Sequence, residues 1–151
     1  MKHSKLFSES NKMPIIRIAP VCNGKIYVVP HPSMDGKSTY MDIPIEESVE
    51  HVSTKSDKVA RKVKENYHQH LNTDATPRFC VQHKSGSASD ATMYLYILPL
   101  REEDEIQFHQ GKFVSTEEIE SGKEKYSHTL QDECTLLGMA AELWDDYYRH
   151  L

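Results

Sequence analysis

Three cysteines and one small polar loop are the residues of this sequence whose side chains could act as nucleophiles. Cys22, Cys80 and Cys134 are widely spaced and odd in number, so neither a disulfide framework nor a CxxC zinc site is expected. Cys80 and His83 would lie on opposite faces of one strand, which argues against a thiol–imidazole pair. The loop Ser85–Asp90 matches neither a nucleophile elbow nor a phosphate-binding loop. We therefore expect small, inert cysteines and no nucleophilic catalysis.

Charged side chains offer a second kind of chemistry. Basic residues gather on one predicted helix, at Lys55, Lys58, Arg61, Lys62 and Lys64. A run of this kind is usually a solvated surface, and contact with an anionic group is the alternative. Arg61 could also be a buried ion-pair partner of a nearby carboxylate. The acidic run Glu102–Glu105 is expected to be an ordinary solvated turn.

The apolar pattern predicts the strands that must position these residues. Ile15–Cys22 and Lys25–Pro30 are apolar runs separated by Asn23-Gly24, a strong signal for a β-hairpin. A loop follows, and then a short strand at Thr39–Pro44 that its proline ends. Three more strands are expected at 78–83, 92–100 and 106–114.

Three helices complete the pattern. Apolar residues recur at helical intervals over Thr54–Leu71, and Ser115 can cap a short helix that contains Ile119. The segment Thr129–Leu151 carries a continuous apolar stripe, which indicates core packing. Strands, helix, strands and two more helices, in that order, predict a sheet packed between helices.

Two short segments of the sequence resemble motifs of a known family. Asp42–Val49 is similar to the Asp-x-x-x-Gly-Gly-x-Val lead-in of the Nudix subgroup that resembles isopentenyl-diphosphate isomerase. Phe113–Ile119 is similar to the Trp-Val-Ser-x-Glu-Glu-Leu segment found late in Nudix domains. The resemblance spans Pro14–His150 and implies an α/β (α+β) fold. That fold is a Nudix-like α/β/α sandwich with a mixed sheet, one long helix carrying the Nudix box and a long C-terminal helix. Residues 1–12 are expected to be a flexible segment, and residues 13–151 a single domain.

The Nudix box itself is degenerate. The family signature is Gly-x5-Glu-x7-Arg-Glu-U-x-Glu-Glu-x-Gly-U, where U is a bulky aliphatic residue. Laid on this sequence without gaps, its defined positions from the first glycine to the last fall on Glu47, Ser53, Arg61, Lys62, Val63, Glu65, Asn66 and His68. Family glutamates hold magnesium against a substrate diphosphate, and of these only Glu65 remains. Lys62 exchanges an attraction for a repulsion of roughly 4 kcal/mol at about 4 Å and an effective dielectric of 20. The resemblance therefore implies a weakened metal site.

Lost glycines weaken the diphosphate site separately. Family glycines at the entrance and exit of the box allow tight turns and close approach of the backbone to the diphosphate. Here Glu46 and Glu47 stand at the entrance and His68 at the exit. Acidic side chains at the entrance would repel an anionic ligand unless a cation intervened.

Our preferred interpretation is a Nudix-fold domain without standard magnesium-dependent pyrophosphohydrolase activity. It would act as a small-molecule-sensing or protein-interaction module, with no cofactor. Lys62, with Lys58 and Arg61 beside it, would then contact an anionic group of the ligand. The partner would be a small anionic ligand or another protein, and a homodimer stays open.

The alternative is a divergent Nudix hydrolase that acts on a diphosphate-linked substrate through a rebuilt acidic site. Glu65 would be its catalytic residue, and Glu65, Glu50 and Glu47 would bind magnesium or manganese. Glu46 or the run Glu102–Glu105 could contribute further carboxylates. Whether the chain is an enzyme is left open between the two interpretations.

Composition and charge limit the number of domains, the class of partner and the cellular location that we expect. The chain has 151 residues, 27% of them charged and 38% hydrophobic, which suits one globular domain. A net charge of −5 argues against a general nucleic-acid binder. No apolar run reaches the length of a membrane span and no signal peptide is visible, so a cytoplasmic location without membrane attachment is expected.

Overall fold

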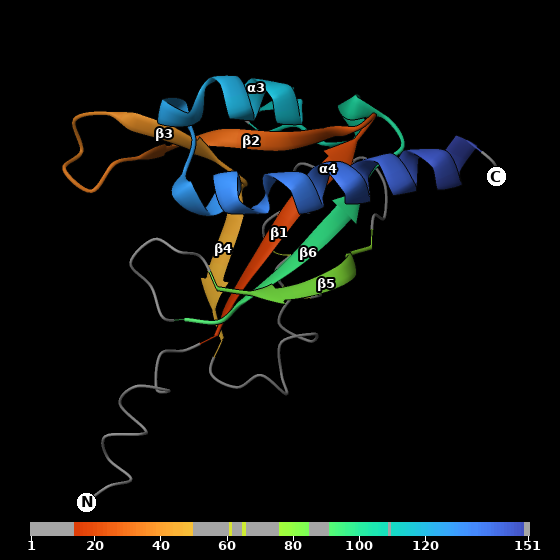
Figure 1. Cartoon of the computed structure of the whole chain (residues 1–151), viewed down its shortest axis with the longest axis horizontal. Coiled ribbons are helices and arrows are strands. Elements are labelled where there is room, and N and C mark those ends of the chain that lie inside the picture. The colour runs from red at the N-terminus through yellow and green to blue at the C-terminus, as the bar shows by residue number, and fades with distance from the viewer. Residues whose placement is uncertain are drawn as a thin grey trace, which may run out of the picture.

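The computed structural model of this chain describes residues 14–49, 61, 65, 76–84, 91–108 and 110–149 (Figure 1). Its described strands form a seven-stranded sheet in the order β3-β2-β1-β6-β5, with β4 paired to β1 and β7 paired to β2. The sheet is mixed, because β1 and β6 are parallel and the other pairs are antiparallel. The strands are β1 (Ile15–Cys22), β2 (Lys25–Pro32), β3 (Thr39–Asp42), β4 (Ile45–Ser48), β5 (Arg78–His83), β6 (Met93–Pro99) and β7 (Lys112–Val114).

The predicted hairpin is confirmed at its turn. Asn23 and Gly24 have φ of 53° and 71°, the left-handed pair that a type I′ turn requires. The turn sets the register, in which Cys22 is opposite Lys25. β2 continues to Pro32, two residues beyond the predicted end, and leads into the β2–β3 hairpin.

β4 is a strand that the sequence analysis did not predict. The expected strand Thr39–Pro44 ends at Asp42, and the chain then pairs again over Ile45–Ser48, antiparallel to the first half of β1. β1 is therefore shared: its start pairs with β4 and its end pairs with β2. This arrangement brings the acidic lead-in segment beside the first half of β1.

Two helices lie on one face of the sheet. α3 (Thr116–Ser121) begins at the predicted cap Ser115, which forms a capping box with Glu118. α4 (His128–Arg149) crosses β1 and β6, while α3 lies near β2 (Figure 1). Two single 3-10 turns are also present: η3 (Glu103–Glu105) lies before β7, and η4 (Lys123–Lys125) lies between α3 and α4.

Side chains alternate between the two faces of β1 and so contribute to two cores. Ala19 and Val21 pack against α4, together with its predicted stripe residues Leu130 and Leu137. Ile16 and neighbouring residues form a second cluster on the other face. The mixed sheet and long C-terminal helix are those expected. The predicted helix Thr54–Leu71 lies outside the described residues except for two positions.

The prediction of a strand over residues 106–114 is wrong for most of its length. Only Lys112–Val114 form β7. The Tyr27 hydroxyl accepts a hydrogen bond from the Phe108 N–H and donates one to its carbonyl oxygen, which holds this stretch in a loop. Gln110 has a φ of 65°, and Gly111 packs so closely on the Tyr27 ring that a Cβ atom would overlap it. Within the described residues, no helix is long and apolar enough to cross a membrane.

Candidate functional site

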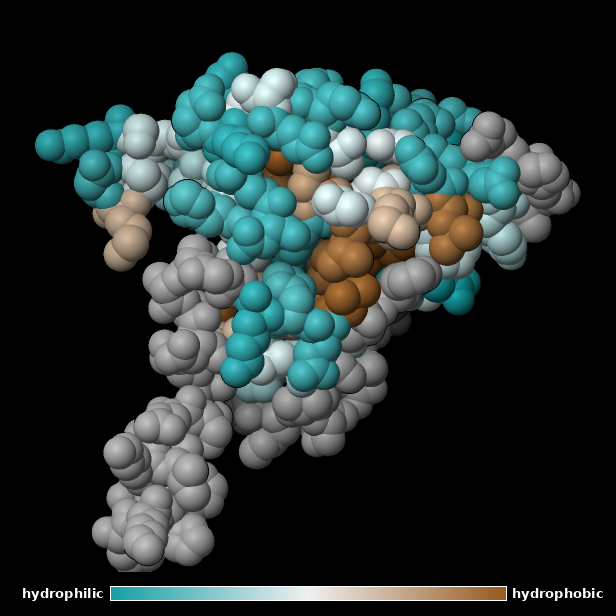
Figure 2. Space-filling model, viewed as in Figure 1, coloured by the Kyte–Doolittle hydropathy of each residue, from teal (hydrophilic) through white to brown (hydrophobic). Residues whose placement is uncertain are grey.

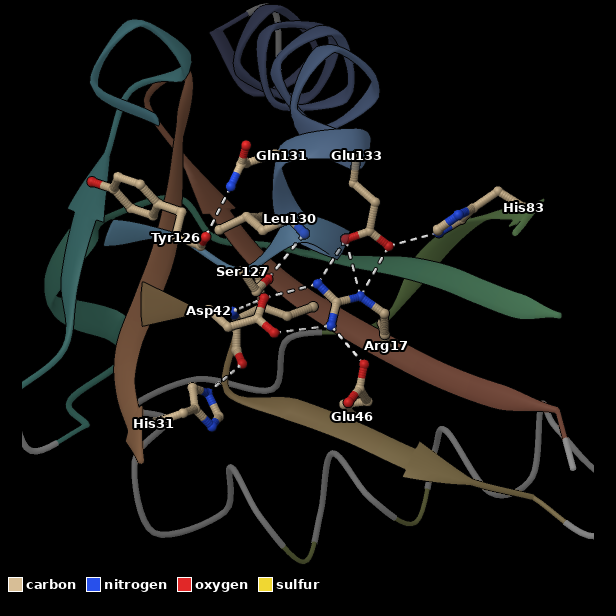
Figure 3. A network of polar contacts seen from close by, with 11 residues as sticks. Arg17, His31, Asp42, Glu46, His83, Tyr126, Ser127, Leu130, Gln131 and Glu133 are labelled. Atoms are coloured by element: carbon tan, nitrogen blue, oxygen red, sulfur yellow. Dashed lines mark hydrogen bonds and ion pairs between the residues drawn. The ribbon is translucent and has the colours of Figure 1, made fainter. Parts of the chain in front are cut away.

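A buried arginine in the first half of β1 is the centre of a polar cluster. Arg17 is a charged residue in an otherwise apolar strand, and it has no solvent exposure. Three carboxylates, from Asp42, Glu46 and Glu133, surround its guanidinium (Figure 3). A buried charge is tolerated only when it is paired and hydrogen-bonded, so this cluster needs a full set of contacts.

Every N–H group of the guanidinium has an acceptor. Nη1 donates to Asp42 Oδ2 at 3.1 Å and to Glu46 Oε1 at 2.9 Å. Nη2 donates to Asp42 Oδ1 at 2.8 Å and to Glu133 Oε1 at 2.7 Å. Nε is shared between the two Glu133 oxygens at 3.0 and 2.9 Å. Arginine has five N–H donors, so none is left for an added ligand.

Secondary structure positions the three carboxylates. Arg17 and Glu46 are directly opposite each other in the β1–β4 ladder, which puts both side chains on the α4 face of the sheet. Glu133 lies one turn into α4, between the buried residues Leu130 and Leu137. The start of α4 is fixed in turn by Ser127, whose N–H donates to the Met41 carbonyl at 3.0 Å. Asp42 follows Met41 at the end of β3, so one contact brings β3 and α4 together.

The cluster reaches solvent at two points. The Glu46 side chain is 47% exposed, whereas those of Asp42 and Glu133 are buried. His83, on β5, places Nε2 2.7 Å from Glu133 Oε2, and its side chain is 17% exposed. The network thus connects β1, β3, β4, β5 and α4 through one guanidinium.

Electrostatics favour the charged form of Arg17. Burial alone would lower its pKa, but attraction to Glu133 and Asp42 and the hydrogen bonds to both outweigh burial and raise it. The residue is therefore a permanent cation inside the domain. It occupies the place that a bound cation would take among these carboxylates, so the cluster is suited to holding elements together.

Metal ligation was predicted for acids near this cluster, and the geometry separates two of them. Glu46 and Glu47 are consecutive in β4 and point to opposite faces of the sheet, with Glu46 bonded to Arg17. Glu47 is opposite Ile16 and partly exposed. Among the described residues, no group of three or more His, Cys, Asp or Glu is arranged to hold a metal ion.

The other predicted site residues lie on the Nudix-box segment. Arg61 and Glu65 both have helical backbone and exposed side chains, so the interpretation of Arg61 as a buried ion-pair partner is wrong. Glu50, Lys58 and Lys62 lie outside the described residues. The metal site and the anion site assigned to this segment therefore stay predictions.

Two further expectations can be compared with the structure. Glu102, Glu103 and Asp104 are exposed, as expected of a solvated turn, but Glu105 is buried and accepts a hydrogen bond from the Arg101 N–H. Cys22 and Cys134 are buried free thiols. Burial, with nearby Asp145 and other acids, raises the pKa of Cys22 to about 12. The burial of both thiols and the raised pKa of Cys22 argue against a nucleophilic role for either cysteine.

The Arg17 cluster itself was missed by sequence reasoning. The signal was available, because Arg17 is a charged residue inside an otherwise apolar strand, and such a residue requires buried carboxylates. Glu133 gave a second signal by interrupting the core-facing side of the C-terminal helix. Which acids would meet Arg17 depended on an unpredicted strand, β4.

Comparison with solved structures supports the architecture. No protein-family model and no curated protein matches the sequence. Solved structures do match. One from Jonesia denitrificans, described as a possible asymmetric diadenosine tetraphosphate hydrolase, has a TM-score of 0.56 at 13% identity and covers 85% of this chain and 96% of its own. A NUDIX-family hydrolase from Clostridium perfringens has a TM-score of 0.55 at 13% identity, covering 86% and 98%. A NUDIX hydrolase from Nitrosomonas europaea has 0.52 at 13%, covering 85% and 88%.

These likenesses identify the class of fold. The chain has a Nudix-like fold, with a mixed sheet and a long C-terminal helix. At this level of identity the likeness concerns the fold alone, because one fold supports many functions. The closer likeness to the isopentenyl-diphosphate-isomerase subgroup stays a prediction.

Proposed function

We propose that this domain is a Nudix-fold binding module that lacks magnesium-dependent pyrophosphohydrolase activity. The pairing of Glu46 with Arg17 at 2.9 Å carries the proposal. A rebuilt acidic site would draw on Glu46 and Glu47, but these residues face opposite sides of β4, and the first already neutralises a buried cation.

The degenerate box supports the same conclusion. Ser53, Lys62 and Asn66 stand at glutamate positions of the family signature. Magnesium requires several oxygen ligands in near-octahedral array, and a lysine among them opposes the ion. Among the described residues, no group of three or more His, Cys, Asp or Glu is placed to hold the ion. Lys62, with Lys58 and Arg61, is the group that we propose to contact an anionic ligand or partner, in the cytoplasm.

The test is isothermal titration of magnesium and of manganese into the full chain, alone and with nucleoside and isoprenoid diphosphates, combined with a hydrolysis assay of the same panel. We expect no metal uptake at micromolar concentrations and no turnover. Metal binding that Glu65→Gln abolishes, together with metal-dependent hydrolysis, would replace this proposal with the divergent-hydrolase alternative.

A matched pair of variants tests the anion contact. Lys62→Ala should weaken binding of anionic ligands, whereas Lys112→Ala, at an exposed lysine on β7, should leave it unchanged. Equal binding by the wild type and both variants would remove Lys62 from the proposal.

A further inference from the structure

A cavity between α4 and the edge of the sheet has no part in the Arg17 cluster. Its volume is about 180 Å³. Strands β5 and β6 contribute Val81, Leu95 and Ile97, and α4 contributes Leu136, Met139 and Leu143 among others. The described residues that line it are all apolar. In Figure 2 a hydrophobic patch on this face of the molecule is bordered by hydrophilic residues.

Large apolar side chains around the cavity are unusually open to solvent. Leu136 is 41% exposed, Met139 64% and Leu143 55%. They follow one another at spacings of three and four residues, so they form a single stripe along α4. Exposed apolar patches of this kind mark binding sites, because covering them removes apolar area from water.

A cation lies near the cavity, although it is not among the residues that line it. Arg78 is the cross-strand partner of Ile97, and paired residues share a face of the sheet, so Arg78 projects on the side that the cavity opens to. Its guanidinium carbon lies 6.0 Å from the centroid of the Trp144 ring, and Trp144 follows Leu143 in α4. At the other end of β5, His83 bonds to Glu133 and belongs to the Arg17 cluster. The positive charge of Arg78 favours an anionic group of the ligand.

We propose that this cavity binds the alkyl chain of a small free carboxylate, with the carboxylate at Arg78. An apolar cavity of about 150 Å³ is large enough to bind benzene, so the present volume suits a chain of about six to eight carbons. The apolar lining gives no partner to a polar chain, and an unpaired buried polar group is costly. Arginine recognises carboxylates through paired N–H donors, which sets the orientation of the chain.

Calorimetric titration of the full chain with butanoate, hexanoate, octanoate and 1-octanol tests the proposal. We expect affinity for the carboxylates to rise about fourfold per added methylene until the cavity is filled. Arg78→Gln should weaken octanoate about tenfold, as for loss of one charge-assisted contact, and leave 1-octanol unchanged. Absence of binding by both octanoate and 1-octanol would overturn the proposal, as would binding that ignores chain length.

Two surface variants with the same substitution give the control. Met139→Glu puts a negative charge at the mouth of the cavity and should abolish octanoate binding. Met34→Glu makes the same change at the fully exposed tip of the β2–β3 hairpin and should have no effect. Both side chains are exposed, so both variants are expected to fold. An equal effect of the two would overturn the proposal.

A second copy of the chain is the competing occupant of this surface. Sedimentation of the wild type and of Met139→Glu distinguishes it, because a wild-type dimer that Met139→Glu dissociates would assign the patch to self-association and overturn the ligand site. The inference goes beyond the proposed function and can fail separately. Hydrolysis of a diphosphate would refute the module proposal without bearing on this cavity.

Discussion

Arg17 connects several elements of the described chain through one side chain. Its side chain is fully buried and bonds to carboxylates from β3, β4 and α4. A buried ion cluster is not by itself a source of great stability, because the desolvation of each charge opposes the attraction. Removing one member is different, since the remaining charges lose their compensation.

Replacing Arg17 should therefore destabilise the domain strongly. We expect Arg17→Met to lower the free energy of unfolding by about 3–5 kcal/mol, because Asp42 and Glu133 would remain buried without a counterion. Arg17→Lys should lose less, since it keeps the charge but not the forked donors. Urea unfolding measures both, with Lys112→Met, at an exposed lysine, as the control. A loss no larger than that of the control would show that the cluster adds nothing to stability.

Cys22 gives a prediction with a definite pH dependence. Burial raises its pKa to about 12 from the ordinary value, so the native thiol resists ionisation. The native state then binds the proton more tightly than the unfolded state, and the contribution of Cys22 to stability falls as the pH rises from about 9 toward 12. Iodoacetamide labelling followed by mass spectrometry should show native Cys22 reacting on the order of a hundredfold more slowly at pH 8 than in urea. Equal rates in the two states would contradict this.

At the scale of elements, the start of α4 decides where Glu133 lies. Ser127 accepts a hydrogen bond from the Leu130 N–H through its hydroxyl, at 3.0 Å, and its own N–H donates to Met41. Gln131 adds a contact from its side-chain amide to the Tyr126 carbonyl, at 2.9 Å (Figure 3). The first turn of α4 is thus tied to β3 before Glu133 is reached.

Removing this cap should weaken the domain by a modest amount. We expect Ser127→Ala to cost about 1 kcal/mol of unfolding free energy, the usual value for loss of a helix cap. Ser127→Asp retains an acceptor and should be close to neutral. Thermal unfolding of both variants measures the effect, and equal losses for Ala and Asp would assign the role of Ser127 to something other than capping.

At the scale of the whole molecule, the architecture is Nudix-like, whereas a Nudix box with few acidic residues stays a prediction from the sequence. The sheet and C-terminal helix pack on two apolar cores. A fold can persist after its chemistry has changed, because function depends on a few residues placed on it.

Restoring glutamates to the box tests whether the fold can regain metal binding without regaining catalysis. We expect the triple variant Ser53→Glu, Lys62→Glu, Asn66→Glu to gain magnesium binding, since it rebuilds carboxylates at the family positions. It should not gain specific turnover, because Glu46, Glu47 and His68 still replace glycines at the entrance and exit. Calorimetric titration measures the first outcome and a diphosphate hydrolysis assay the second. Rapid, specific turnover would show that these glycines are dispensable.

The sequence by itself determined the elements that depend on residues close together in the chain. Asn23-Gly24 set the first hairpin, Ser115 with Glu118 set the start of α3, and helical periodicity set α4. Only the tertiary structure decided the rest. β4 forms because it pairs with the first half of β1. The strand expected over 106–114 is shorter because the Tyr27 hydroxyl is hydrogen-bonded to the backbone of Phe108. The partners of Arg17 come from 25, 29 and 116 residues away along the chain. Contacts at such separations are fixed by how elements pack, which no local pattern contains.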